Sequence, residues 1–339
     1  MGRRAHLQAA IVGTLIGVGC IVLVLRQVDL KQSWNTLGRL NGPFLVVPVV
    51  VFLTNLPLRA WRWQMIFPAS SRPRFGDCLA VLGIGNMANF VLPARAGDVA
   101  RCILLGNGTT LSGSSRTLAT LAVEKILDGV ALIGMVLFAA WSLHPPHWLF
   151  QILRVAAFVF SGAILAVILL RHQTRSLTGV ANRLLRILHM SFLERGANRL
   201  LTSLSDGLSV VDSAQQMFIL FLATAAIWIT EAVLIWGLGG ALELGISLKS
   251  AVIASAVLGL GLMIPAAPGG LGTYELFGTE AFKLTGIASS GALALTIVIH
   301  AWVYVVNITA GLCLLALKGI SVAQLRRQVA DEAPSTAQP

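Results

Sequence analysis

Long apolar runs alternate with short polar or basic segments along most of the chain. A run of about 20 apolar residues is long enough to cross the hydrocarbon core of a bilayer as a helix. Such runs predict six membrane spans, at residues 7–25, 43–58, 117–141, 148–170, 216–238 and 290–317. The first run follows a basic N-terminus, as in a signal peptide, but no clean cleavage site follows, so we expect an uncleaved span. Residues 59–63 (RAWRW) end the second run and are interpreted as a basic and aromatic interface anchor.

Two further apolar stretches, residues 78–106 and 251–285, are interrupted by helix-breaking residues. The first is interrupted at LPARAGD (92–98) and the second at IPAAPGG (264–270). Because proline ends a helix and glycine allows a turn, we predict two re-entrant hairpins that each enter and leave on one side of the membrane. Their predicted turn residues are Pro93, Gly97, Pro265, Pro268, Gly269, Gly270 and Gly272. Ordinary loops between complete spans remain the alternative.

Basic residues are distributed unevenly between the two sides of this topology. With a cytoplasmic N-terminus and two re-entrant hairpins, 18 of the 25 Lys and Arg residues face the cytoplasm and five face outward. This bias agrees with the positive-inside rule and also places the C-terminus in the cytoplasm. Residues 171–213 carry six arginines among Leu and Ile, which predicts an amphipathic cytoplasmic linker on the membrane surface. Residues 321–339 form a polar cytoplasmic tail.

The same topology divides a single transmembrane domain, residues 1–320, into two halves of opposite orientation. Residues 1–141 and residues 148–318 each comprise two spans, a hairpin and a further span. Inverted repeats with interrupted helices that meet near the bilayer midplane are typical of transporters. We therefore predict an all-α fold, a polytopic transmembrane helical bundle of two inverted repeats, each with a re-entrant hairpin.

The composition excludes several other classes of protein. Hydrophobic residues make up 56% of the chain and charged residues 12%, about half the charged fraction of a soluble domain. The net charge of +11 is explained by cytoplasmic loops beside anionic lipids, so no nucleic-acid partner is expected. We predict no metal site and no cofactor, because no CxxC pair occurs among Cys20, Cys78, Cys102 and Cys313.

Charged and polar residues inside the apolar segments are the candidates for function, because charges are costly in a membrane. A helix that begins near Ala96 would direct its N-terminal amides toward the first hairpin tip beside Arg95, which suits a phosphate. Glu124 and Asp128 share one helical face and are predicted to hold the hairpin arginines or to carry protons. A purely structural ion-pair network remains open. The candidates for substrate binding or coupling are Asn89, Arg95, Asp98, Arg101, Glu124, Lys125, Asp128, Glu231, Tyr274, Glu275 and His300.

The motif APGGLGTYE (267–275) is rich in glycine but lacks the lysine and the strand-to-helix context of a nucleotide-binding loop. We interpret it as a tight turn with exposed backbone amides, after which Tyr274 and Glu275 begin the returning arm. His300 is a single polar residue in an apolar span, and a lone buried histidine is more often a packing residue than a functional one.

Three motifs together resemble the lysylphosphatidylglycerol synthase transmembrane region family. They are LPARAGDVAR (92–101), VEKILD (123–128) and PGGLGTYE (268–275). The resemblance covers about residues 10–320 and implies translocation of a lipid or lipid-linked substrate across the bacterial cytoplasmic (inner) membrane. The chain has Lys125 where the family more often has arginine. About 20 residues follow the last span, so the aminoacyltransferase activity of the fused family members is not expected.

We therefore expect a stand-alone lipid flippase rather than an enzyme. Arg95 and Arg101 would bind the head group of a membrane lipid or polyprenyl-linked substrate, with Tyr274 and Glu275 as the counterpart on the second hairpin. One alternative is a membrane-embedded lipid-modifying transferase that uses Glu124, Asp128 and His300 as acid–base groups. Another is a non-catalytic membrane partner of a separate glycosyltransferase or synthase. A homo-oligomer remains open.

Overall fold

The all-α class expected from the apolar pattern is confirmed by the computed structural model. The model describes residues 18–24, 26, 29–37, 45–92, 96–105, 111–140, 147–172, 179, 182–183, 214–262 and 267–319, and this part contains no strand. Residues 18–24 are helical. The remaining helices are α2 (Leu30–Leu37), α3 (Val46–Ile66), α4 (Phe75–Val91), α5 (Ala96–Leu105), α6 (Leu111–Ala140), α7 (His147–His172), α10 (Ala214–Ala241), α11 (Leu248–Leu262), α12 (Thr273–Leu284) and α13 (Ser289–Leu317), with the 3₁₀ turns η2 (Ala69–Ser71) and η4 (Pro268–Gly270).

Each of the helices α3, α6, α7, α10 and α13 coincides with one predicted span. Residues 215–241 and α13 are the two described helical segments that are long and apolar enough to cross a membrane by length and composition. Helix α6 has 30 residues but carries several charged side chains. Residues 7–17 of the first predicted span, most of the 171–213 linker and the 321–339 tail lie outside the described residues.

Helix α3 extends beyond the predicted second span, and this changes the role of the RAWRW motif. No helix-breaking residue follows Pro57 until Phe67, which precedes a proline and adopts an extended conformation. Arg62 and Trp63 therefore lie inside the helix and are buried. Their interpretation as a membrane-interface anchor is wrong, because the face of α3 that carries them is turned toward neighbouring helices.

Both interrupted stretches are pairs of packed helices. Helix α4 packs against α5, and α11 packs against α12. The turn before α12 places Gly269, Gly270 and Gly272 at φ values of 66°, 78° and 86°, a backbone region that glycine adopts without steric cost. The predicted turn residues Pro93 and Pro265 lie outside the described residues, as does Arg95. Re-entry of each helix pair on one side of a membrane stays a prediction.

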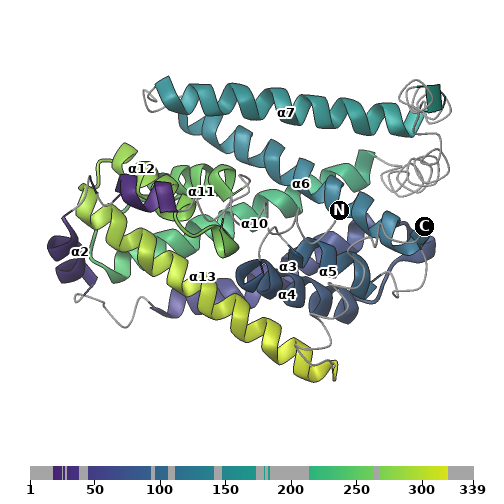
Figure 1. The fold of residues 1–339 in the computed structure, drawn as a ribbon, viewed down its shortest axis with the longest axis horizontal. Coiled ribbons are helices and arrows are strands. Elements are labelled where there is room, and N and C mark those ends of the chain that lie inside the picture. Colours follow the sequence, from purple (N-terminus) through teal and green to yellow (C-terminus); the bar gives the residue numbers. More distant parts are fainter. Residues whose placement is uncertain are drawn as a thin grey trace, which may run out of the picture.

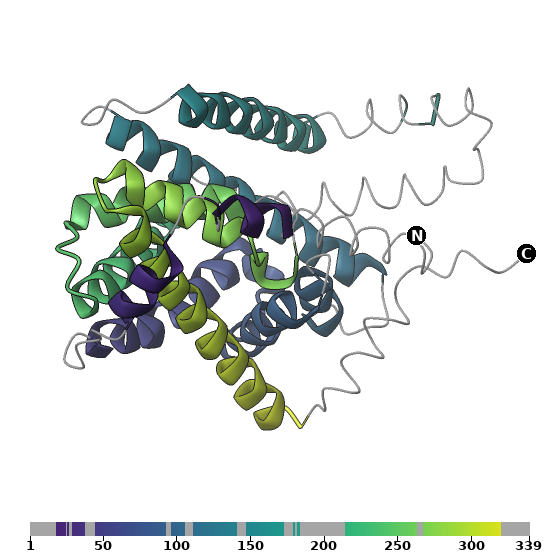
Figure 2. The ribbon, with the colours of Figure 1, turned by 60° about the vertical axis from the view of Figure 1, so that its left-hand side comes forward.

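The helices form one packed assembly with α7 at its edge (Figures 1 and 2). Helix α13 crosses the bundle and packs against α12 and α4. Helix α10 packs against α3 and α11, and α7 runs along α6. The largest apolar core lies mainly between α10, α11, α12 and α13, and a second core lies between α3, α4 and α6. The polar site described below is held between these two cores.

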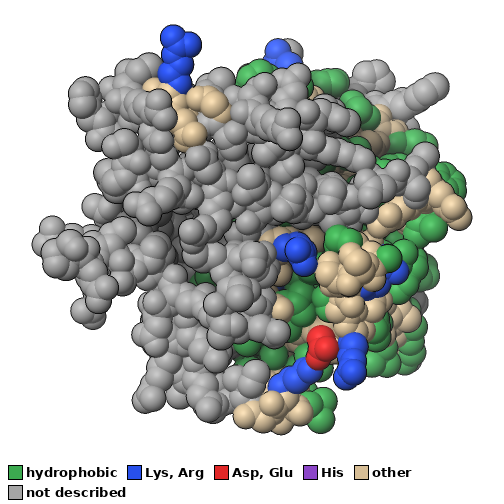
Figure 3. Space-filling model, turned by 90° about the vertical axis from the view of Figure 1, so that its right-hand side faces the viewer, with side chains coloured by type: hydrophobic (Ala, Val, Ile, Leu, Met, Phe, Trp, Pro, Cys, Tyr) green, Lys and Arg blue, Asp and Glu red, His purple; other side chains and the backbone are tan. Residues whose placement is uncertain are grey.

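Much of the described surface is apolar. Hydrophobic side chains predominate over charged ones among the described residues of the face shown in Figure 3. Large apolar side chains also project outward from single helices: Phe158 on α7 is 82% exposed and Phe138 on α6 is 73% exposed. Surfaces of this kind are expected where a helix contacts lipid rather than water.

Close contact between two backbones, rather than a turn, explains why residue 97 is a glycine. This glycine lies in the first turn of α5, whereas the sequence predicted it to form the hairpin turn. A Cβ at this position would overlap the carbonyl oxygen of Gly85 on α4 and the side chain of Asn89. Small residues allow membrane helices to approach this closely. The two arms of the first helix pair are therefore joined by a glycine-to-glycine contact.

Replacement of Gly97 by alanine should lower thermal stability, because the added methyl forces α5 away from α4. Gly134 is a matched control, since it also lies in a helix but has open space where a Cβ would project. G134A should be neutral or stabilising, as alanine favours a helix by about 1 kcal/mol over glycine. Thermal unfolding of both purified variants in detergent measures the difference, and an equal effect of the two substitutions would contradict the assigned contact.

Candidate functional site

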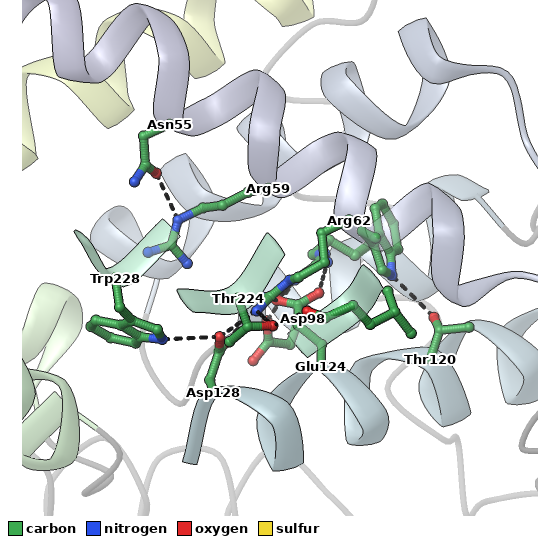
Figure 4. Close-up of polar contacts among 12 residues, drawn as sticks. Asn55, Arg59, Arg62, Asp98, Thr120, Glu124, Asp128, Thr224 and Trp228 are labelled. Atoms are coloured by element: carbon green, nitrogen blue, oxygen red, sulfur yellow. Dashed lines mark hydrogen bonds and ion pairs between the residues drawn. The ribbon is translucent and has the colours of Figure 1, made fainter. Parts of the chain in front are cut away.

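A buried ion pair joins α3 to α6. Arg62 Nη1 donates to Asp128 Oδ1 at 2.5 Å and Nη2 donates to Oδ2 at 3.3 Å. The arginine side chain is 1% exposed and the aspartate side chain 8% exposed. Arg62 also donates to Thr224 Oγ1 on α10 at 3.0 Å. Figure 4 shows that the guanidinium and the carboxylate point toward each other between the helices.

A second buried ion pair joins α5 to the same face of α6. Arg101 donates to both oxygens of Glu124, at 2.6 Å and 3.3 Å. Its guanidinium lies over the Trp63 ring, 4.1 Å from the centroid, which adds a cation–π contact. Arg62 Nη2 lies 3.9 Å from Glu124 Oε1, so the two pairs form one network. Of the two carboxylates predicted to hold the hairpin arginines, Glu124 pairs with Arg101, whereas Asp128 pairs with Arg62, which lies outside the hairpin.

The structure changes the role expected of Arg101. Its side chain is 2% exposed and its guanidinium is engaged by Glu124, with Asp98 at 3.8 Å. It is not part of the lining of the cavity described below, and its burial against Glu124 keeps it from an exposed head group in this arrangement. Lys125 is half-buried and takes no part in these pairs.

The N-terminus of α5 is capped from within the protein. Asn89 Oδ1 on α4 accepts a hydrogen bond from the Gly97 amide at 2.9 Å. Its amide nitrogen lies 3.5 Å from Asp98 Oδ1. The N-terminal amides of this helix were expected from the sequence to bind a phosphate. One of them, the Gly97 amide, is instead hydrogen-bonded to the Asn89 side chain. Asn89 and Asp98 therefore connect α5 to α4.

A third ion pair is half-exposed and connects α3 to α10. Arg59 donates to Glu231 Oε1 at 2.9 Å and to Asn55 Oδ1 at 2.7 Å. Trp228 links this pair to the buried network: its Nε1 donates to Asp128 Oδ1 at 3.3 Å, and the Arg59 guanidinium lies 5.7 Å from its ring centroid. Figure 4 shows Asn55 joined to Arg59 on α3, and Trp228 joined to Asp128.

Arg59 and Arg62 were not among the residues singled out in the sequence. A signal was present, because Asn55, Arg59 and Arg62 are spaced by four and three residues and so share one face of an otherwise apolar helix. The RAWRW motif concealed it, since basic and aromatic residues at the end of an apolar run are also the pattern of an interface anchor.

The Arg59–Glu231 pair lies on the wall of a cavity of about 280 Å³. Helices α3, α4, α10, α11, α12 and α13 all contribute lining residues. Most of the wall is aliphatic or aromatic, including Phe52, Phe90 and Trp302. The polar wall contains Asn55, Arg59, Asn86, Glu231 and Asn307. A few polar groups in a largely apolar cavity are characteristic of small-molecule sites.

The two helix interruptions meet beside this cavity. Phe90, near the end of α4, makes an edge contact with Tyr304 on α13, with ring centroids 4.7 Å apart. The Tyr304 hydroxyl donates to the Pro268 carbonyl at 2.9 Å, in the η4 turn. The η4 turn also packs directly against α4. The end of the first interrupted helix therefore touches the turn of the second.

A polar cluster holds the η4 turn. Glu275 Oε2 accepts the Gly272 amide at 2.6 Å, and its Oε1 lies 2.5 Å from His300 Nδ1. His300 Nε2 lies 3.0 Å from the Gly269 carbonyl oxygen. Tyr274 stacks on the histidine ring. His300 is therefore buried with both ring nitrogens hydrogen-bonded, one to Glu275 on α12 and one to the η4 turn.

Loss of one member of a buried pair should destabilise the bundle more than loss of both. R62M leaves the Asp128 carboxylate in an apolar core without its main cation, at an expected cost of about 3–5 kcal/mol. The double variant R62M/D128L removes both charges and should recover much of this loss. Chemical or thermal unfolding in detergent measures both variants. The exposed Lys318–Asp77 pair provides the control, since K318M should cost less than about 1 kcal/mol.

Comparison with known proteins gives two matches. The model of the family described as "Lysylphosphatidylglycerol synthase TM region" matches residues 10–311. "Glycosyltransferase AglD" from Haloferax volcanii is 26% identical over 331 residues, which is 89% of this chain and 53% of that relative. The chain therefore spans about half the length of this curated relative.

The family match covers every helix of the site. It includes α3, α5, α6 and α10, which carry the ion pairs, and the Glu275–His300 cluster. It also agrees with the family resemblance of the three sequence motifs. The chain belongs to the lysylphosphatidylglycerol synthase transmembrane region family, a family of helical membrane proteins.

Proposed function

We propose that the chain translocates a lipid or lipid-linked head group across the cytoplasmic membrane. The observation that carries this proposal is the cavity with one charged wall, placed where the two interrupted helices meet. Backbone that departs from a helix at membrane depth is tolerated where it is buried in protein or lines a cavity. Interrupted helices that converge on a binding site are the usual arrangement in transporters.

The cavity suits an amphipathic ligand. Arg59, with a side chain 22% exposed, offers a cation to an anionic head group, and Asn55 and Asn307 offer amides. Aromatic and aliphatic side chains line the remainder and would contact the first part of an acyl or isoprenoid chain. This proposal assigns head-group binding to Arg59 in place of Arg101, which is buried against Glu124.

The proposed topology retains two inverted repeats and two re-entrant helix pairs. The contact between α4 and the η4 turn supports it, because opposed hairpins from the two sides would meet in this way near the midplane. Both termini would be cytoplasmic, as the distribution of basic residues favours. Alternating access would then require one helix pair to separate from the other beside the cavity.

A second candidate function rests on the relative named a glycosyltransferase. In this reading, the chain is the membrane partner of a lipid-modifying enzyme or is itself a membrane-embedded transferase. Lipid analysis of a deletion strain separates the candidates. Loss of one lipid species would favour the enzymatic reading, whereas an unchanged composition with an altered distribution between leaflets would favour translocation.

Substitution of Arg59 by glutamine should impair lipid exchange without preventing folding. A hydrogen bond to a charged group contributes about 1.5–3 kcal/mol, so the exchange rate should fall roughly 10- to 100-fold. The assay uses proteoliposomes of phosphatidylethanolamine and phosphatidylglycerol with a trace of tail-labelled phosphatidylglycerol, and a parallel series with a labelled polyprenyl phosphate. Arg154 is exposed on α7, so R154Q is the matched control.

The double variant R59Q/E231Q removes both charges of the cavity wall. It should fold as well as the wild-type protein and remain impaired in exchange, because an amide lacks the charge of the guanidinium. Full exchange by a well-folded double variant would show that the pair is only structural.

Single cysteines test the re-entrant topology in a background without the four native cysteines. Arg72 and Asn107 flank the first helix pair, whereas Lys249 and Ala288 flank the second. Re-entry predicts that cysteines at the first two positions react with an impermeant maleimide from the cytoplasmic side, and that those at the last two react from outside. Labelling of Arg72→Cys and Asn107→Cys from opposite sides would exclude the first hairpin.

A further inference from the structure

Glu275 and His300 form a pair whose hydrogen-bond geometry requires one shared proton. The Gly269 carbonyl is only an acceptor, so His300 Nε2 at 3.0 Å must carry a hydrogen to donate to it. The other ring nitrogen, Nδ1, lies 2.5 Å from Glu275 Oε1. A hydrogen must lie between these two atoms as well, either on the histidine or on the carboxyl group.

Loss of that proton breaks one of the two contacts. If Nε2 keeps its hydrogen, the Nδ1 lone pair faces a carboxylate oxygen, and two acceptors repel each other. If the hydrogen moves to Nδ1, the Nε2 lone pair faces the Gly269 carbonyl oxygen instead. Neither tautomer of a neutral histidine satisfies both partners of the deprotonated pair.

Loss of either contact would weaken the hold on the same turn. His300 bonds the Gly269 carbonyl of η4 directly, and its contact with Glu275 Oε1 fixes the carboxylate whose other oxygen, Oε2, accepts the Gly272 amide. Three glycines with positive φ give this turn little resistance to a change in conformation. The Glu275 side chain is 16% exposed, which leaves the pair accessible to proton exchange.

The groups around the pair do not replace the proton. Tyr274 stacks on the histidine ring at 4.1 Å between centroids, and Tyr304 contacts its edge at 4.9 Å. Among the described residues, the ion pair available to Glu275 is the one with His300. No described arginine or lysine is therefore placed to hold the Glu275 carboxylate if the pair loses its proton.

The neighbouring elements contribute further titratable groups at greater range. The thiol of Cys20, in the helix 18–24, and Glu231 on α10 interact electrostatically with Glu275 and Tyr274 respectively. The charged residues of α11 and α4, Lys249 and Asp77, lie in the first turns of those helices, away from η4. The acidic partner Glu231 is already neutralised by Arg59.

We propose that the Glu275–His300 pair is a proton-binding site that holds the η4 turn closed when protonated and releases it when the proton leaves. The proton passes to water, and the pair becomes a neutral histidine beside a carboxylate. This inference rests on the proposed function in one respect, since release of the turn beside the cavity would link lipid translocation to proton movement. It reassigns the proton-carrying role from Glu124 and Asp128, which are held by arginines.

The first test follows the accessibility of the turn as a function of pH. Leu271 is 44% exposed beside η4, and L271C is introduced into the full chain without native cysteines. Its alkylation rate in detergent is divided by that of a cysteine at the exposed Ala288, which corrects for thiol ionisation. One linked proton changes an equilibrium by at most about tenfold per pH unit. The ratio should therefore rise by up to about tenfold for each pH unit as pH increases through the transition.

The variant E275Q separates a proton site from a simple helix cap. Its amide nitrogen can donate to His300 Nδ1 and its oxygen can accept the Gly272 amide, so it keeps both contacts without a titratable proton. The ratio in E275Q should stay low at every pH. E280Q on the same helix is the matched control and should follow the wild-type profile. A flat wild-type profile, or parallel profiles of E275Q and wild type, would overturn the proposal.

The second test uses proteoliposomes of the composition given above. An imposed pH gradient should shift the leaflet distribution of the labelled lipid for the wild type and E280Q, and not for E275Q. Lipid exchange with a flat accessibility profile would refute the proton site while the proposed function stands. A pH-dependent profile without lipid exchange would refute the proposed function while the proton site stands.

Discussion

Buried charge is the constraint on which this bundle depends. An uncompensated ion in an apolar interior costs several kcal/mol, so the carboxylates of α6 can be tolerated only where cations meet them. Asp128 is met by Arg62 and Glu124 by Arg101, and these contacts fix α3 and α5 on one side of α6. A hydrogen bond from Arg62 to Thr224 and one from Trp228 to Asp128 extend the attachment to α10. The cavity exists between helices whose positions this network determines.

The hydrophobic pattern predicted the long helices, because each long apolar run forms an element by itself, but it did not predict the short helix α2 or the last eight residues of α3. The helical face shared by Glu124 and Asp128 was also predictable, since it depends on local spacing alone. Their pairing with Arg62 was not, because 66 residues separate Arg62 from Asp128 and no local rule selects which arginine reaches a given carboxylate. The two hairpin arginines were the predicted partners, and one of them, Arg101, pairs with Glu124.

The contact between Glu275 and His300 could not be predicted from the sequence either. Glu275 and His300 were singled out separately as unusual residues in apolar segments, but their contact depends on how α12 packs against α13.

Gly97 is a residue whose importance was predicted for a reason that the structure does not support. Glycine near a proline favours a turn in the sequence, whereas here its small size serves the contact between α4 and α5. Sequence spacing identified the right residue and assigned it the wrong physical reason.

The pairing of charges has a consequence for the response of the protein to membrane voltage. Arg59, Arg62 and Arg101 are each bonded mainly to one carboxylate, so the three pairs carry no net charge by themselves, and Asp98 lies outside them at 3.8 Å from Arg101. A voltage performs work of about 2.3 kcal/mol per elementary charge per 100 mV on a charge that crosses the membrane. Movement of neutral pairs through this field involves almost no such work. The electric field can therefore act on a translocation cycle mainly through the charge of the transported head group and of any proton that accompanies it.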